Sequence, residues 1–144
     1  MVFLEIEKTV VEGAGAAGLA ALLCDQAKGS GRFKGKRIGL VLTGGNIDLL
    51  MLGERIKHGM VRARRLARIR VDLRDLPGAL AQATELIASA HANITAVHHQ
   101  RAFTALPVCN VEVDFVLQTR GSEHIQEVIT VLHAAGFETS NHNH

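Results

Sequence analysis

The chain has 144 residues, of which 47% are hydrophobic and 21% charged, with a formal net charge of +2. This composition is typical of a packed protein and excludes an intrinsically disordered one. Five Phe with no Trp or Tyr argue against a platform that stacks nucleic-acid bases, and the small net charge argues against a nucleic-acid partner. No apolar run is long enough to span a bilayer. Two cysteines, Cys24 and Cys109, are typical of a reducing compartment, so we expect a cytoplasmic protein without a membrane partner.

The N-terminal segment is rich in Gly and Ala between residues 13 and 23. Gly13, Gly15 and Gly18 match the letters of a dinucleotide-binding fingerprint. Such a site also needs a second strand that ends in an acidic residue about 20 positions later. The next apolar stretch, residues 37–42, is followed by Thr43 and Gly44 and by no carboxylate. We therefore reject a nucleotide site here and expect a helix whose small residues allow close packing.

Residues 37–42 are apolar on both faces, which predicts a strand in a parallel sheet that is covered on both sides. A glycine-rich turn follows at residues 43–46, and we expect a helix from about Asp48 to Lys57. The order of helix, buried strand, turn and helix indicates a partial α/β segment, which is too small to close a sheet by itself.

Two motifs in this segment, residues 12–17 (EGAGAA) and 41–48 (VLTGGNID), resemble the last part of the catalytic domain of pyridoxal-phosphate-dependent threonine dehydratases. Serine racemase and serine dehydratase are relatives of these enzymes. The resemblance implies that Glu12 lines the cofactor pocket and that the Thr43 hydroxyl meets the pyridine nitrogen, where a serine is usual. It implies a cofactor-binding remnant made of Glu12, Thr43, Gly44, Gly45 and Asn46.

The chain lacks two motifs on which catalysis in this family depends. Its Schiff-base lysine, in a Ser-x-Lys-x-Arg-Gly setting, is absent from the chain, and so is its phosphate-binding loop. Without them the cofactor has neither a covalent attachment point nor a cradle for its phosphate. We therefore expect no catalytic residue in this chain and no cofactor bound by this chain alone, although the parent enzyme uses pyridoxal phosphate. An alternative is a subunit that completes a pyridoxal-phosphate site together with a separate catalytic chain.

The second half of the chain begins with a strand over residues 66–73. Apolar residues at 67, 69, 71 and 73 alternate with charged residues, which predicts a half-buried strand and explains part of the arginine run at 62–70 as a solvated face. A helix over residues 77–90 follows, with Asp75 as its cap and Pro77 in its first turn. The apolar face of this helix is predicted to consist of Leu76, Leu80, Ala83 and Ile87.

Two further strands are predicted at residues 94–103 and 111–117. The helix after them has Ser122 as its N-cap and Gly136 as the left-handed residue beyond its end. Ile125, Val128, Ile129 and Leu132 are expected to face inward from it. A short strand at 137–139 completes a βαββαβ order, which predicts the ferredoxin-like α+β arrangement.

Residues 68–139 resemble the ACT family of amino-acid-sensing domains, which many threonine dehydratases carry at the C-terminus. The best signatures are residues 70–78 (RVDLRDLPG) and 92–94 (ANI). The resemblance implies that an effector's carboxylate meets backbone N–H groups at the turn. It also places Asn93 near the amino group of the effector, commonly across a subunit interface. Asn93 could equally cap the end of the preceding helix. The implied effector site comprises Asp75, Leu76, Pro77, Gly78, Asn93 and Ile94.

Together these patterns predict a catalytic-domain fragment at residues 1–60, a linker at 61–66, an ACT domain at 67–140 and a tail at 141–144. We expect an amino-acid-sensing region that binds isoleucine or valine at the interface of a homodimer or higher homo-oligomer formed through the ACT sheet. A ligand-free dimerisation module is the bare alternative. No metal site is expected, because His98 and His99, adjacent on a strand, point to opposite faces.

Overall fold

The computed structural model describes residues 2–100 and 110–141. The chain divides into two compact units, residues 1–56 and residues 57–144, and each is described by itself. No helix in the part of the chain that the structure describes is long and apolar enough to cross a membrane.

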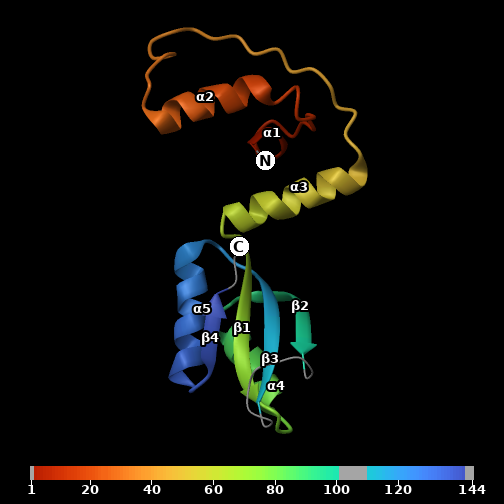
Figure 1. The fold of residues 1–144 in the computed structure, drawn as a ribbon, viewed down its shortest axis with the longest axis vertical. Coiled ribbons are helices and arrows are strands. Elements are labelled where there is room, and N and C mark those ends of the chain that lie inside the picture. Colours follow the sequence, from red (N-terminus) through yellow and green to blue (C-terminus); the bar gives the residue numbers. More distant parts are fainter. Residues whose placement is uncertain (1, 101–109, 142–144) are drawn as a thin grey trace. The chain divides into compact units, whose positions relative to one another are not determined.

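The second unit contains a four-stranded antiparallel sheet and two helices that pack against each other (Figure 1). In chain order the elements are β1 (Leu66–Arg74), α4 (Ala79–Ser89), β2 (Asn93–Gln100), β3 (Asn110–Gln118), α5 (Ser122–Ala134) and β4 (Glu138–Asn141). The strand order is β2-β3-β1-β4, and each neighbouring pair is antiparallel. The α+β class and the βαββαβ order predicted from the sequence are confirmed.

The core lies between the inner face of this sheet and the two helices. The period-2 alternation predicted for β1 and β3 is confirmed, because their inward residues are all buried. On α5, Ile125, Val128 and Leu132 are buried and Ile129 packs partly against the core, as predicted. The largest fully buried side chains are those of Phe115, Ile69, Leu73, Ile87, Leu117, Ile125, Leu132, Val71, Val113 and Val128.

The apolar face predicted for the first helix of this unit is partly wrong. Ala83 and Ile87 are buried, but Leu76 is 61% exposed and Leu80 is 37% exposed. Leu76 lies in the turn before α4, where helical spacing no longer decides which way a side chain points. Only the middle and end of the predicted apolar stripe therefore contribute to the core.

Glycines, and not the predicted polar residues, precede both helices of the second unit. Gly78 (φ 91°) precedes α4 and Gly121 (φ 138°) precedes α5, both in the left-handed half of backbone space that favours glycine. Asp75 and Pro77 therefore lie before the helix, and Ser122 is itself the first residue of α5. The prediction for Gly136 is confirmed: its φ is 85°, and its N–H donates to the His133 carbonyl at 2.9 Å.

The outer face of the sheet carries an ion-pair network across β1 and β3. Arg70 donates from Nε to Asp114 Oδ1 at 2.7 Å and from Nη2 to Asp114 Oδ2 at 3.2 Å. Its Nη1 lies 3.1 Å from Glu112 Oε2. The hydrogen bond to Asp114 raises the pKa of the Arg70 guanidinium. This bidentate pair satisfies the Asp114 carboxylate, which is buried on the face of the sheet opposite the core residues.

The first unit contains α1 (Val2–Glu5), α2 (Ala17–Lys28) and most of α3 (Leu49–Arg62), which continues into the second unit. The structure places no strand in the described residues of this unit, so the strand predicted at residues 37–42 is wrong. These residues are exposed and irregular, since a single apolar stretch has no neighbouring strand to pair its backbone N–H and C=O groups.

Candidate functional site

The turn between β1 and α4 borders a hollow of about 680 Å³ in the second unit. Leu76, Pro77 and Gly78, which the sequence predicted as site residues, line it, whereas Asp75 belongs to the turn but not to the lining. The opposite wall comes from the turn between α5 and β4. The complete lining consists of Asp72, Arg74, Leu76, Pro77, Gly78, Ala79, Gln82, Ala135, Gly136 and Phe137. We call this space the turn hollow.

The turn hollow combines three kinds of chemistry. The first N–H groups of α4 have no acceptor within the helix, so this end of the hollow favours an anion. The Ala79 N–H is already used, because it donates to the Leu76 carbonyl at 3.2 Å. Arg74 and Asp72 add a cation and an anion from one face of β1, and Leu76 and Phe137 add apolar surface. A small zwitterion with an aliphatic side chain matches this combination.

Asn93 and Ile94 lie at the other end of the sheet from the turn hollow. Asn93 pairs with Gln118, and Gln118 pairs with Leu66 at the start of β1, whereas the turn follows the end of that strand. Eight residues of strand separate the two ends, or about 26 Å. The structure therefore does not bring Asn93 and Ile94 together with Asp75–Gly78 within one chain.

The side chains of these two residues also have defined surroundings. The Asn93 Nδ2 donates to Gln118 Oε1 at 3.3 Å, so this bond goes to β3 and not to the end of α4. That helix end is closed by backbone bonds, among them Ala92 N–H to the Ile87 carbonyl at 3.2 Å. Ile94 is half-buried and packs against the core.

Sequence reasoning missed the half of the turn hollow that α5 and β4 supply. Gly136 was predicted only as a helix terminator, and Phe137 only as the start of a strand. The structure brings them beside the first turn because β4 pairs with β1, with Glu138 opposite Asp72. The βαββαβ order was the one signal that could have found them, since a ferredoxin-like sheet places its first and last strands side by side.

In the first unit, the two motifs that resemble a cofactor pocket lie against each other. The Glu12 N–H donates to the Gly44 carbonyl at 3.0 Å. A Cβ at Gly15 would overlap the Thr43 carbonyl oxygen, and a Cβ at Gly44 (φ 81°) would overlap the Glu12 side chain. The Thr43 backbone therefore excludes a side chain at position 15, whereas at position 44 glycine is favoured by the positive φ and the Glu12 side chain can move aside. A Cβ added at Gly45 would lie 3.5 Å from the Val10 carbonyl oxygen, which is an ordinary van der Waals distance.

This paired motif does not by itself fit pyridoxal phosphate. Thr43 and Asn46 are exposed, and the described residues place nothing over them that could enclose a cofactor ring. All five lysines are exposed, and Lys8 Nζ donates to the Glu5 carbonyl at 2.6 Å. The arrangement is one wall of a pocket, and we derive no chemical step through the cofactor from it.

Metal ligands do not gather in the described residues. Within residues 2–100 and 110–141 no group of three or more His, Cys, Asp or Glu side chains could hold an ion. The terminal histidines of the chain, His142 and His144, lie outside the described residues.

Comparison with known proteins relates nearly the whole chain to one kind of enzyme. Over 134 residues, 93% of the chain, it is 46% identical to the L-threonine ammonia-lyase of Geobacter sulfurreducens. Over 135 residues, 94% of the chain, it is 36% identical to the L-threonine ammonia-lyase of Thermotoga maritima. Nearly the whole chain therefore aligns with one part of each of these two enzymes. It spans about a third (32%) of the length of each of these threonine ammonia-lyases.

Comparison with protein-family models gives no match. Among solved structures, a prephenate dehydratase from Staphylococcus aureus subsp. aureus Mu50 superimposes on 54% of this chain and 28% of its own, with a TM-score of 0.43 and 15% identity. A formyltetrahydrofolate deformylase from Pseudomonas putida KT2440 superimposes on 55% of this chain and 29% of its own, with a TM-score of 0.37 and 14% identity.

Proposed function

We propose that the second unit is the amino-acid-sensing regulatory domain of a cytoplasmic threonine ammonia-lyase. The parent reaction is the pyridoxal-phosphate-dependent dehydration and deamination of L-threonine to 2-oxobutanoate and ammonia. The observation that carries the proposal is the turn hollow, which joins a helix N-terminus, a pair of opposite charges and apolar surface in one place. The similarity to two threonine ammonia-lyases supports it independently.

In this proposal the effector is a branched-chain amino acid such as isoleucine or valine. Its carboxylate accepts from the free N–H groups at the start of α4, which Gly78 leaves open to the hollow. Its ammonium group lies toward the Asp72 carboxylate, and its aliphatic side chain packs against Leu76 and Phe137. Burial of such a side chain contributes about 1.5–3 kcal/mol, which makes a larger aliphatic effector bind more tightly than alanine.

The proposed site is completed by a second copy of the chain. Asn93 lies about 26 Å along the sheet from the turn of its own chain, so it can meet the effector only when it comes from a partner. Among the described strands, β2, on which Asn93 lies, is an edge strand that pairs with β3 alone. Pairing of this edge between two copies extends the sheet and forms the homodimer of the proposal.

Regulation of the enzyme by the effector follows from thermodynamic linkage between effector binding and the states of the enzyme. An effector shifts the activity of the whole enzyme only by binding one of its states more tightly than the other. A coupling of about 1–3 kcal/mol changes substrate affinity by roughly 5- to 150-fold. An effector that joins two copies at the turn hollow binds the paired state preferentially, and this preference is the source of the coupling.

Calorimetric titration of the purified chain with isoleucine, valine, threonine and serine tests the proposal. We expect saturable binding of isoleucine or valine and weaker binding of serine, since serine leaves the apolar wall uncovered. Sedimentation in parallel establishes whether the chain is dimeric. A dimer that binds none of the four amino acids would contradict effector binding and would leave a ligand-free dimerisation module.

A further inference from the structure

The C-terminal end of α3 is closed by a residue in an unusual conformation. Arg64 has a φ of 55°, in the left-handed region that residues with a side chain rarely adopt. Its N–H donates to the Val61 carbonyl at 3.0 Å, and the Arg65 N–H donates to the Met60 carbonyl at 2.8 Å. These two bonds form a Schellman motif, in which glycine usually occupies the position that Arg64 holds. Such a strained ending persists only where other contacts stabilise it.

Thr119, the residue that follows β3, supplies contacts of this kind. Its hydroxyl donates to the Arg64 carbonyl at 2.6 Å, and its N–H donates to the Arg65 carbonyl at 3.0 Å. Thr119 is only 8% exposed, whereas Arg64 is exposed. A buried threonine therefore ties the end of α3 to the end of β3 through two consecutive carbonyl groups. We call these two hydrogen bonds the threonine latch.

A second Schellman motif, at the end of α4, is a matched reference for the first. His91 has a φ of 59°, and its N–H and the next one donate back into α4 at 2.9 and 3.2 Å. The side-chain contact in that motif is made by His124 Nε2, which lies 2.7 Å from the Ala90 carbonyl oxygen. This contact precedes the left-handed residue, so it does not hold the carbonyl of His91 as Thr119 holds that of Arg64.

The threonine latch lies next to the residue that contacts Asn93. Gln118 immediately precedes Thr119, and its Oε1 accepts from Asn93 Nδ2 at 3.3 Å. Because this bond engages the amide nitrogen of Asn93, the amide oxygen is the atom that can accept from an ammonium group. An effector held by Asn93 therefore restrains Gln118 and, through the backbone, the adjacent Thr119.

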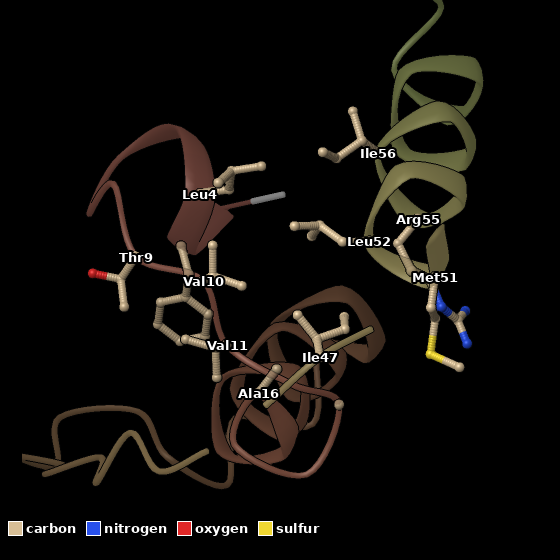
Figure 2. A pocket seen from close by; sticks show the side chains of 12 residues that line it. Leu4, Thr9, Val10, Val11, Ala16, Ile47, Met51, Leu52, Arg55 and Ile56 are labelled. Atoms are coloured by element: carbon tan, nitrogen blue, oxygen red, sulfur yellow. The ribbon is translucent and has the colours of Figure 1, made fainter. Parts of the chain in front are cut away.

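On its other side the threonine latch holds a helix that both units share. α3 is one helix of 14 residues, which begins in the first unit and ends in the second. Figure 2 shows Leu52 and Ile56 extending from α3 toward Leu4 and Val10, around a hollow of about 430 Å³ in the first unit. α3 is thus the element through which a change at Arg64 can reach the first unit.

We propose that the threonine latch is a regulatory device with two states, which couples effector binding to the ending of α3. The device rests on the proposed function, because a partner copy contributes Asn93 to the effector site. In the released state the hydroxyl bond of Thr119 is broken and Arg64 relaxes to a negative φ. The effector binds the latched state more tightly, because that state holds Gln118 and Asn93 in place. By reciprocity, a variant that favours release weakens effector binding.

Calorimetric titration of the 144-residue chain with isoleucine tests this coupling. Thr119→Val keeps the shape of the side chain and removes the hydroxyl, so it should weaken binding about 5- to 10-fold. Thr119→Ser keeps the hydroxyl and should stay within about twofold of the wild type. Thr130→Val is the surface control, since the Thr130 hydroxyl donates within α5 to the Gln126 carbonyl at 2.8 Å, and it should also stay within about twofold.

Variants at the left-handed residue separate the coupling from the loss of one hydrogen bond. Glycine adopts a positive φ without strain, so Arg64→Gly added to Thr119→Val should restore the affinity to within about threefold of the wild type. His91→Gly, added to the same variant, relieves strain at the end of α4 and should restore nothing. Arg64→Val, at an exposed position, should by itself weaken binding about 5- to 10-fold, because a β-branched residue strongly disfavours positive φ.

The possible results distinguish failure of the effector site from failure of the coupling. A wild-type chain that does not bind isoleucine would overturn both. Wild-type binding that Thr119→Val and Arg64→Val leave unchanged would overturn the coupling alone. Equal rescue by His91→Gly and Arg64→Gly would also overturn the coupling, since Thr119 would then contribute only to general stability. A far-UV circular dichroism spectrum that matches the wild type shows that each variant is folded.

Discussion

Replacement of Arg70 by Met should destabilise the second unit by about 2–3 kcal/mol. The substitution removes two hydrogen bonds, at 2.7 and 3.2 Å, from an Asp114 carboxylate that is only 7% exposed, and it also removes the pairing with Glu112. Loss of one partner of a buried ion pair costs about 3–5 kcal/mol. Because the Arg70 side chain is 29% exposed, solvent screens part of the interaction and lowers the expected value.

Thermal unfolding followed by far-UV circular dichroism measures this loss, since the chain has no Trp or Tyr to report by fluorescence. For a domain of this size the predicted change lowers the Tm by about 10–20 °C. The matched control is Arg68→Met, on the same strand and face but exposed, where loss of a surface interaction costs up to about 1 kcal/mol. A Tm for Arg70→Met that equals that of Arg68→Met would refute the structural role assigned to the pair.

Three further predictions test other contacts. His124→Phe should cost about 1–3 kcal/mol in chemical denaturation, because the buried ring accepts from the Arg120 N–H at 3.1 Å and its Nε2 lies 2.7 Å from the Ala90 carbonyl. Gly44→Ala should accelerate hydrogen exchange at the Glu12 amide, whereas Gly13→Ala, with open space around it, should not. Leu76→Ala should weaken isoleucine binding about 5- to 10-fold in calorimetry and leave stability almost unchanged, since Leu76 is 61% exposed.

The second unit was predictable from the sequence because its strands have one buried face each. Alternation of Ile69 and Val71 with Arg68 and Arg70 determines which side chains enter the core, and a slip by one residue would bury the arginines. The same argument holds for β3. Local periodicity is therefore sufficient to predict the strands and their buried side chains where one face of a sheet packs against the core and the other is exposed to solvent.

The first unit and the turn hollow were harder to predict for different reasons. The apolar residues 37–42 match a buried strand by composition, but burial depends on a neighbouring strand that the described residues do not provide. Phe137 lies about 60 positions from Leu76 in the sequence, and only the pairing of β4 with β1 brings their two turns to one hollow. Register across a sheet is a property of the fold and not of any local pattern.

The most direct test of the proposed effector site is a calorimetric comparison of two glycine variants. Gly78 and Gly121 each precede a helix with positive φ, and a Cβ would meet no atom within 4 Å at either position. Alanine strains the backbone at both positions, and more at Gly121, whose φ of 138° and ψ of −173° lie in a region that is almost restricted to glycine, but only Gly78 lines the turn hollow. We predict that Gly78→Ala weakens isoleucine binding at least about tenfold, whereas Gly121→Ala retains wild-type affinity. Equal affinities for the two variants, or no binding to the wild-type dimer, would contradict the proposed site.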